Sequence, residues 1–357
     1  MSRAPRAVKQ VEVADDEDHA IRANPDLFGH DSAAETLEIA ARSGRLPHAW
    51  MAAGPPGIGK ATLGYRFARW LMAGEAERAT PRPAGTAPLH LSPDHPAFRR
   101  IAAGAHADLR ALRPSAEAGI KKVIRVDDVR AAIRFLAMTP AEGGWRFVLV
   151  DSAELMRPEA ANALLKTLEE PPPRAVLMLT TAAPDRLLPT ILSRVRRLDL
   201  SPLPVATLDP LLARLLPALD ATERAALARI AEGSAGRAMM LAEGEGLAIQ
   251  AKVDAVLAGL VAGDRRGWHA LADSIAAKRD GSSFATFIAL LRQAISGAVR
   301  QVARGATPPA WLAPRPLAEW STLWDSLGRL AAETDGLSLD RKQAVLTALG
   351  WLSPPRR

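Results

Sequence analysis

The stretch AAGPPGIGKATLGYRF, residues 52–67, decides the fold of this chain. The positions that fit the pattern G-x-x-x-x-G-K-[ST] are Gly54, Gly57, Gly59 and Lys60. In such a loop the glycines let backbone N–H groups converge on phosphate groups, and the lysine offsets the phosphate charge. The preceding HAWMAAG predicts a short buried strand, and the following ATLGYRFARWLMAG predicts a helix. Strand, glycine-rich loop and helix in this order predict a phosphate-binding loop.

The hydrolytic part of such a site is incomplete in this sequence. The residue after the lysine, whose hydroxyl normally binds Mg²⁺, is Ala61, and Thr62 points about 100° further round the helix. In VLVDSAEL, Asp151 ends a predicted strand, but Ser152 stands where a glutamate would polarise the attacking water. Glu154 lies too far along to take over that role. We therefore expect no efficient ATP hydrolysis at this site.

Alternating strand and helix patterns predict the fold class. Apolar runs such as WRFVLVD and AVLMLTT suit strands of a parallel sheet covered on both faces, and helices such as DSAAETLEIAA, with Asp31 as its N-cap, lie between such strands. A three-layer α/β domain is expected, followed by segments that contain only helical patterns. The expected divisions are a lead-in over 1–24, the α/β domain over 25–200 with an irregular insertion at 74–118, a small helical domain over 201–245 and a larger one over 246–357.

Two motifs contain arginines that are candidates for phosphate contacts. TILSRVRRL places Arg194 directly after Ser193, where the chain leaves the sheet and could reach a phosphate on a neighbouring subunit. On spacing alone, a surface arginine in an ion pair is the commoner outcome. Any of Arg194, Arg196 and Arg197 could be such an exposed residue. In GSAGRAMMLAE, Arg237 stands in the first turn of a helix, where a cation is unfavourable, so a functional reason is expected.

Composition narrows the function classes. The 357 residues include no cysteine, which excludes disulfides and thiolate metal sites, and the net charge of +7 is too thinly spread to indicate DNA binding by itself. His90, His95 and His106 lie in the insertion, and we interpret them as loop residues because their spacing does not suit a metal. The N-terminus lacks the apolar segment of a signal peptide, and no apolar stretch approaches the roughly 18 residues of a membrane helix. A cytoplasmic protein without a membrane partner is expected.

Five motifs occur together in an order and spacing that indicate a family. They are GPPGIGKAT, VLVDSAE, NALLKTLEEPP, LTTAAPDRLLPTILSR and GSAGRA. This set resembles the bacterial DNA polymerase III clamp-loader subunits of the AAA+ class, over residues 25 to about 245. The resemblance implies an AAA+ P-loop domain followed by a small helical lid domain, and the C-terminal third agrees with the family's helical collar domain in type only.

The resemblance also implies a function. Members of the family form an arc of five subunits that opens and closes the ring-shaped sliding clamp on primed DNA, powered by ATP at subunit interfaces. The insertion, which ends GAHADLRAL, and the eroded Mg²⁺ and water-activating positions resemble the member that does not hydrolyse ATP. Implied partners are the ATPase motor subunits and delta in a hetero-pentamer, the sliding clamp, and primer–template DNA. The chain is expected to have no ATPase or polymerase activity of its own, although it belongs to the DNA polymerase III holoenzyme, and to bind ATP or ADP weakly at most.

The resemblance assigns roles to particular residues. Ser193-Arg194 occupies the family's Ser-Arg-Cys motif, with Val195 in place of the cysteine, which makes Arg194 an arginine finger that acts in trans. Arg237 resembles the lid-domain arginine that senses nucleotide. Many relatives carry a four-cysteine zinc cluster in the insertion; since this chain has no cysteine, no zinc and no other metal is expected.

Three alternatives make different demands on the sequence. An active ATPase subunit of the same loader requires a hydroxyl at position 61 and a glutamate at 152, and Ala61 and Ser152 contradict it. A related DNA-remodelling motor, such as a helicase, needs its own water-activating residue. A plain DNA-binding protein requires a concentrated basic face, whereas basic and acidic residues alternate here, although contacts to primer–template DNA inside an assembly remain compatible with the sequence.

Overall fold

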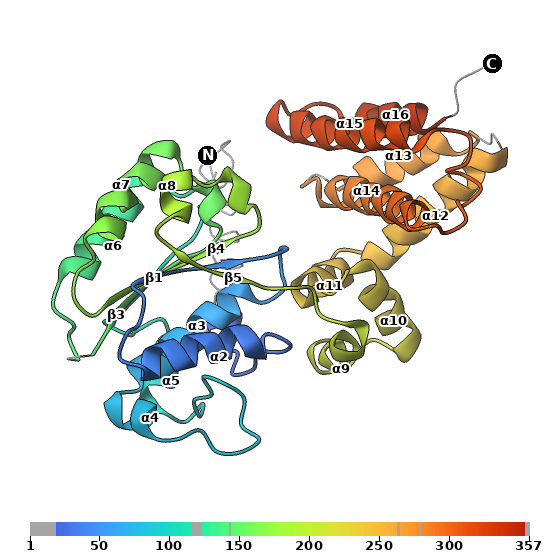
Figure 1. Ribbon diagram of the computed structural model, residues 1–357. Helices are drawn as coiled ribbons and strands as arrows, with labels where there is room; N and C mark the ends of the chain where they lie inside the picture. The colour runs from blue at the N-terminus through green and yellow to red at the C-terminus, as the bar shows by residue number, and fades with distance from the viewer. Residues whose placement is uncertain (1–18, 116–122, 143, 263–264, 279, 354–357) are drawn as a thin grey trace, which may run out of the picture. The chain divides into compact units, whose positions relative to one another are not determined.

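The computed structural model describes residues 19–353 except 116–122, 143, 263–264 and 279. The chain forms two compact units, each described here by itself (Figure 1). Unit 1 consists of the described residues up to Leu211 together with Glu232–Gly236, and unit 2 consists of Leu212–Ala231 with the described residues from Arg237 onward. The predicted boundary between a lid and a collar domain at residue 246 stays a prediction.

A five-stranded parallel sheet forms the centre of unit 1. Its strands lie in the order β2-β3-β4-β1-β5. Their bounds are β1 Ala49–Ala53, β2 Leu109–Leu112, β3 Arg146–Val150, β4 Ala175–Thr181 and β5 Arg196–Asp199. All pairs are parallel, with Trp50 beside Met178 of β4 and Arg196 of β5. The central strands β1, β3 and β4 are buried throughout, as their continuous apolar runs predict.

Helices cover both faces of this sheet (Figure 1). On one face lie α2 (Asp31–Arg42) and α3 (Lys60–Met72); on the other lie α6 (Val126–Ala137), α7 (Pro158–Glu169) and α8 (Pro189–Leu192). Successive side chains of a strand alternate between the two cores: Phe147 and Leu149 pack with the first group, and Val148 and Val150 with the second. The P-loop α/β fold class is thereby confirmed.

The structure corrects two local predictions. The insertion at 74–118 is not irregular throughout, because it contains α4 (Glu75–Ala79), α5 (Pro96–Ala102) and the edge strand β2. The β2 sequence LRAL is short and contains an arginine, so it lacks the apolar run that marks the other strands. Asp31 is not the N-cap of α2: His30 holds that position, and Asp31 contributes its charge to the first turn.

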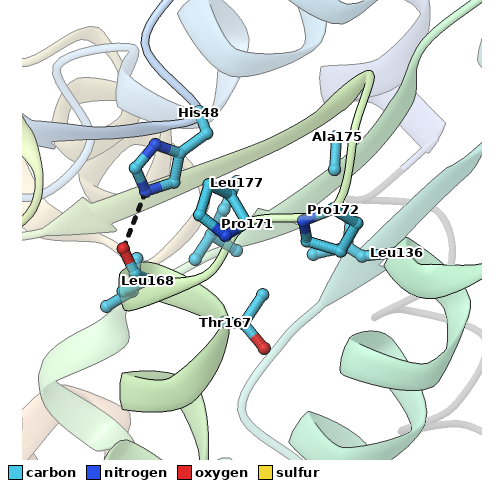
Figure 2. A pocket seen from close by; sticks show the side chains of 8 residues that line it. All are labelled: His48, Leu136, Thr167, Leu168, Pro171, Pro172, Ala175 and Leu177. Atoms are coloured by element: carbon cyan, nitrogen blue, oxygen red, sulfur yellow. Dashed lines mark hydrogen bonds between the residues drawn. The ribbon is translucent and has the colours of Figure 1, made fainter.

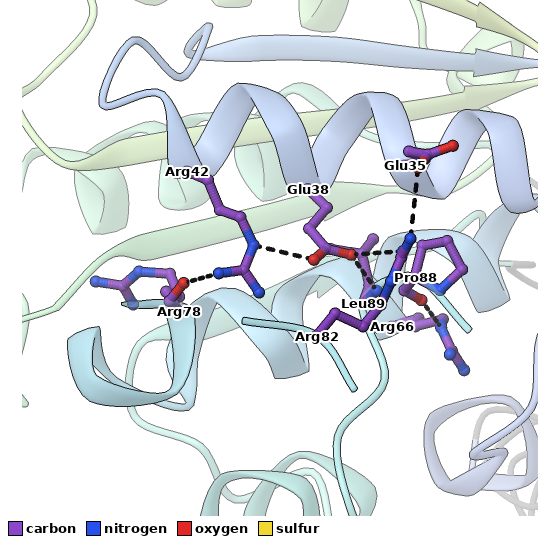
Figure 3. Close-up of polar contacts among 8 residues, drawn as sticks. All are labelled: Glu35, Glu38, Arg42, Arg66, Arg78, Arg82, Pro88 and Leu89. Carbon is purple, nitrogen blue, oxygen red and sulfur yellow. Dashed lines mark hydrogen bonds and ion pairs between the residues drawn. The ribbon is translucent and has the colours of Figure 1, made fainter. Parts of the chain in front are cut away.

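A buried glutamate anchors the insertion to α2 (Figure 3). Glu38 is 5% exposed and accepts hydrogen bonds from Arg42 Nε at 3.0 Å, Arg82 Nη1 at 3.1 Å and the backbone N–H of Leu89 at 3.0 Å. Arg82 and Leu89 both belong to the insertion, so one carboxylate ties two of its points to the helix. Among the described residues, no group of three or more histidines and acidic residues is placed to hold a metal ion, and the absence of zinc stays a prediction.

The described part of unit 2 is helical, as the patterns after residue 204 predict. Its complete helices are α10 (Ala221–Ile230), α12 (Gly246–Ala262), α13 (Trp268–Ala276), α14 (Ser282–Ala303), α15 (Leu317–Gly336) and α16 (Arg341–Leu352), while α9 (Val205–Leu215) and α11 (Ala235–Glu243) begin in unit 1. By length and composition alone α14 could span a membrane, which the sequence analysis did not anticipate. Its apolar face, including Phe287 and Leu291, is buried, and α14 packs against α12 and α15, as expected of the core helix of a helical unit.

Candidate functional site

The glycine-rich loop leaves β1 at the carboxyl edge of the sheet and enters α3. Gly54, Gly57 and Gly59 have φ values of 156°, 73° and 105°, which residues with a side chain rarely adopt. A Cβ on Gly54 would lie 2.4 Å from the carbonyl oxygen of Leu200, so this position excludes any side chain. The three glycines therefore permit the tight turn that brings the chain to the N-terminus of α3, where phosphate binding is favourable.

Lys60 is folded back onto its own loop. It is 9% exposed, and its Nζ donates hydrogen bonds to the carbonyl oxygens of Gly54 and Pro55, each at 2.7 Å. Burial lowers the pKa of Lys60, while the charges of Asp151 and Glu154 partly offset that shift. The lysine thus braces the loop and lies close enough to both carboxylates to be stabilised by them.

Two carboxylates lie at or just beyond the end of β3, and Glu154 Oε2 is buried without a hydrogen-bond partner among the described residues. Asp151 accepts a hydrogen bond at 2.5 Å from the hydroxyl of Thr180, which in turn accepts from the backbone N–H of Ser152 at 3.0 Å. Glu154 Oε1 accepts a hydrogen bond at 3.1 Å from the backbone N–H of Ala182, beyond the end of β4. Asp151 therefore lies at the carboxyl edge of the sheet, as predicted, whereas Glu154 is bonded to the backbone just after β4. Sequence reasoning missed Thr180; its signal is a hydroxyl inside an otherwise apolar strand.

A second residue that the sequence analysis missed is His30, which supports the loop from the start of α2. Its Nε2 lies 2.6 Å from the carbonyl oxygen of Ile58, and the residue is 3% exposed. Burial lowers the pKa of His30, so the neutral ring that donates to this carbonyl is favoured. His30 helps to fix the loop geometry before the lysine.

The segment Gly233–Gly236 packs directly on the same loop within unit 1. Ser234 Oγ donates to the carbonyl of Pro56 at 2.9 Å, and the backbone N–H of Gly236 donates to the carbonyl of Gly57 at 2.9 Å. A Cβ on Gly236 would lie 3.0 Å from the Gly57 backbone. The GSAG motif thus has a local role that its sequence did not reveal: it occupies two loop carbonyls and leaves the loop N–H groups for a phosphate.

The predicted lid arginine is held inside unit 2. Arg237 Nη2 donates to the side-chain oxygen of Gln293 on α14, and Gln293 Nε2 donates to the carbonyl of Ile230 at 3.0 Å. These contacts join the start of α11 to α14 and the end of α10. A structural function for Arg237 follows from them, and its function as a nucleotide sensor stays a prediction.

Arg194 lies at the opposite edge of the sheet from the glycine-rich loop. It lies two residues before β5, whose first residue, Arg196, is paired with Trp50, four residues before Gly54. At about 3.3 Å per residue, those four residues separate the two edges by roughly 13 Å along the strand. Arg194 therefore lies on the far side of the sheet from its own loop.

The Arg194 guanidinium has three contacts. Nη1 donates to the carbonyl of Thr190 at 3.0 Å and to Ser193 Oγ at 3.1 Å, and Nη2 lies 2.7 Å from Glu169 Oε1. Its side chain remains 34% exposed. The ion pair that spacing alone favours is present, and the guanidinium still borders the solvent. Arg197 pairs with Asp199 at 2.7 Å.

A small apolar hollow near the amino edge of the sheet does not resemble a nucleotide pocket (Figure 2). His48, which precedes β1, donates a hydrogen bond from Nε2 to the carbonyl oxygen of Leu168 at 3.0 Å. The remaining lining comes from the ends of α6 and α7, the prolines after α7, and β4; these residues are Leu136, Thr167, Pro171, Pro172, Ala175 and Leu177. The hollow offers neither charge nor a row of N–H donors, and it lies away from the loop.

The loop side of the site fits a phosphate but not the full hydrolytic machinery. Gly54, Gly57, Gly59 and Lys60 form the cradle, and Asp151 is placed at the adjacent strand end. Thr62 lies in the first turn of α3, yet position 61 carries a methyl group where a Mg²⁺ ligand would be needed. The expectation that this site hydrolyses no ATP efficiently stays a prediction.

Comparison with known proteins agrees with these features. A family model described as "DNA polymerase III, delta subunit" matches residues 29–204. DNA polymerase III subunit delta' of Pseudomonas aeruginosa is 42% identical over 171 residues, which cover 48% of each chain. The same subunit of Escherichia coli is 36% identical over 212 residues, which cover 59% of each chain. The match thus spans about half the length of these relatives.

One solved structure aligns with most of the chain at low identity. A DNA polymerase III gamma-subunit-related protein of Thermotoga maritima aligns with 91% of this chain and 99% of its own, at 20% identity and a TM-score of 0.45. The family match over residues 29–204 covers the loop, the end of β3 and the Arg194 motif together. Residues 29–204 thus match the family described as DNA polymerase III, delta subunit, and the chain is similar to the delta' subunits of two bacteria.

Proposed function

We propose that this chain is the delta prime subunit of a DNA polymerase III clamp loader: a stator that hydrolyses no ATP and supplies Arg194 to the active site of a neighbouring ATPase subunit. In that capacity it assembles with the motor subunits and delta in a hetero-pentamer and helps to load the sliding clamp onto primed DNA in the cytoplasm. The names of its relatives and the family match support the assignment.

The observation that carries the proposal is the separation of the two halves of the site. The phosphate loop lies at the carboxyl edge of the sheet without a Mg²⁺ hydroxyl at Ala61, while Arg194 lies half-exposed at the amino edge. An arginine so far from its own loop can contact a γ-phosphate only on another subunit. This arrangement supports a division in which chemistry takes place next to this chain and not within it.

The chemistry assigned to Arg194 is electrostatic. A guanidinium that contacts the γ-phosphate stabilises the charge that develops as the phosphate is transferred, an effect worth about 10³- to 10⁵-fold in rate in phosphoryl-transfer enzymes. The chain's own loop is then a structural element, with Lys60 bound to loop carbonyls and at most weak affinity for ATP or ADP. Arg237 would contribute to structure through Gln293.

The alternative is an active ATPase subunit of the same loader. Thr180 and Asp151 form a hydrogen-bonded pair at the correct strand end, which such a subunit would also need. Against this alternative, Ser152 stands where the water-polarising glutamate would be, and Glu154, two residues further on, has its Oε1 bonded to the backbone N–H of Ala182 and its Oε2 buried. The stator is therefore the better supported function.

The test compares Arg194→Ala with Arg197→Ala in a reconstituted loader. Arg197 is a matched control, since it is exposed and paired with Asp199 on the same edge strand. We expect the DNA-stimulated ATPase rate to fall by at least about 100-fold with Arg194→Ala, given the usual size of a finger effect, and to change less than twofold with Arg197→Ala. Equal rates for the two variants would contradict the proposal.

A further inference from the structure

The C-terminus of α7 contains an electrostatic conflict that needs an explanation. Its last residue is Glu169, followed by Glu170 and three prolines. The carbonyl end of a helix carries partial negative charge, so two glutamates there are unfavourable unless a cation compensates them. Lys166 in the last turn of α7 supplies one cation, and Arg194, from the segment before β5, supplies a second, whose Nη2 lies 2.7 Å from Glu169 Oε1.

The same contact fixes the orientation of the arginine. Nη1 is bound to Thr190 and Ser193 of its own segment, whereas Nη2 is bound to Glu169 of a different helix. A guanidinium has five N–H donors in a rigid plane, and these three contacts leave two of them for an outside group. The contact from α7 prevents the plane from turning about its own segment, and the two remaining donors keep one direction.

We propose that Glu169 is a positioning residue, which holds the Arg194 guanidinium in the orientation that a neighbouring subunit's γ-phosphate requires. The inference rests on the proposed function of Arg194 in trans and adds to it a residue on a separate element. Glu169 touches neither phosphate nor nucleotide; it acts through Arg194. A long side chain loses much rotamer entropy when it is fixed. Because the ion pair with Glu169 already orders Arg194 in the free chain, less of that entropy is lost when Arg194 contacts a phosphate.

The test uses Glu169→Gln, which removes the charge and keeps the shape, in the reconstituted loader. Without the ion pair, Arg194 keeps its two local hydrogen bonds, but its contact with α7 is reduced to at most a neutral hydrogen bond to the amide oxygen. We expect the maximal DNA-stimulated ATPase rate to fall about three- to tenfold, while the KM for ATP stays unchanged. A fall of this size corresponds to part of the entropic cost of ordering one arginine side chain. The thermal unfolding midpoint of the free chain should stay unchanged because the pair is largely exposed.

Glu170→Gln is the matched control. Glu170 is exposed, carries the same charge at the same helix end, and has no ion pair within the described part of the chain. Its substitution should leave the rate unchanged. A Glu169→Gln rate equal to that of Glu170→Gln, or higher than the wild-type rate, would overturn the inference.

A double-substitution cycle separates this inference from the proposed function. If Glu169 acts through Arg194, Glu169→Gln should have no further effect in an Arg194→Ala background. An additional loss in that background would show that Glu169 acts on another part of the molecule and would refute the inference. If Arg194→Ala itself leaves the rate unchanged, the proposed function fails; if only Glu169→Gln does so, the positioning role alone fails.

Discussion

Glu38 should be the side chain on which the stability of the insertion depends most. In Glu38→Gln the amide nitrogen replaces one oxygen: in place of Oε2 it leaves both the Leu89 N–H and Arg82 Nη1 without their acceptor, and in place of Oε1 it leaves Arg42 Nε without one. Leaving the buried N–H of Leu89 unpaired lowers the free energy of unfolding by about 1–3 kcal/mol. The bonds from Arg42 and Arg82 add less than about 1 kcal/mol each, since these side chains are 27% and 31% exposed and can be rehydrated. We expect a loss of about 2–4 kcal/mol in the free energy of unfolding.

Urea unfolding measures this loss, and hydrogen exchange at the Leu89 amide shows where it arises. Glu35→Gln is the control, because Glu35 is 52% exposed and its contact with Arg82 is 3.4 Å long; it should cost less than about 0.5 kcal/mol. The reasoning is refuted if Glu38→Gln is as stable as Glu35→Gln, or if the Leu89 amide keeps its protection.

Two further predictions concern the glycine-rich loop. Gly54→Ala should lower the free energy of unfolding by about 2–4 kcal/mol, because its Cβ would lie 2.4 Å from the Leu200 carbonyl oxygen and its φ is positive; chemical unfolding showing a loss below 1 kcal/mol would contradict this. Burial lowers the pKa of His30 below that of the unfolded chain. Below about pH 6.5 the unfolded state therefore binds a proton that the folded state does not. The free energy of unfolding should then fall by up to about 1.4 kcal/mol per pH unit as the pH is lowered, until the folded pKa is reached. His30→Gln, which can still donate to Ile58, should reduce this acid sensitivity, whereas a profile changed equally by substitution of the exposed His90 would count against it.

Much of unit 1 could be predicted from local sequence. The glycine-rich loop, the buried strand before it and the helix after it follow from backbone requirements and apolar periodicity, which act over a few residues. Asp151 could be placed at a strand end for the same reason. β2 could not, because its four residues contain no apolar run and are ordered by pairing with β3.

The contacts that complete the site join residues far apart in the chain. Glu38 and Arg82 are separated by 44 positions, and Ser234 reaches Pro56 across 178. The apolar periodicity of a sequence reflects local structure and does not predict contacts between residues so far apart in the chain. The partner of Arg194 is an exception in one respect: a glutamate at the end of α7 opposes the helix dipole, a local signal in LEEPP that the sequence analysis did not use.

The most direct test of the account compares Arg194→Ala and Lys60→Ala by the steady-state, DNA-stimulated ATPase rate of the reconstituted loader, alongside the isolated chain. We expect the isolated chain to hydrolyse no ATP, Arg194→Ala to reduce the rate of the assembly strongly, and Lys60→Ala to change it little. ATP turnover by the isolated chain that Lys60→Ala abolishes would contradict the central claim, because hydrolysis would then take place in the chain's own loop.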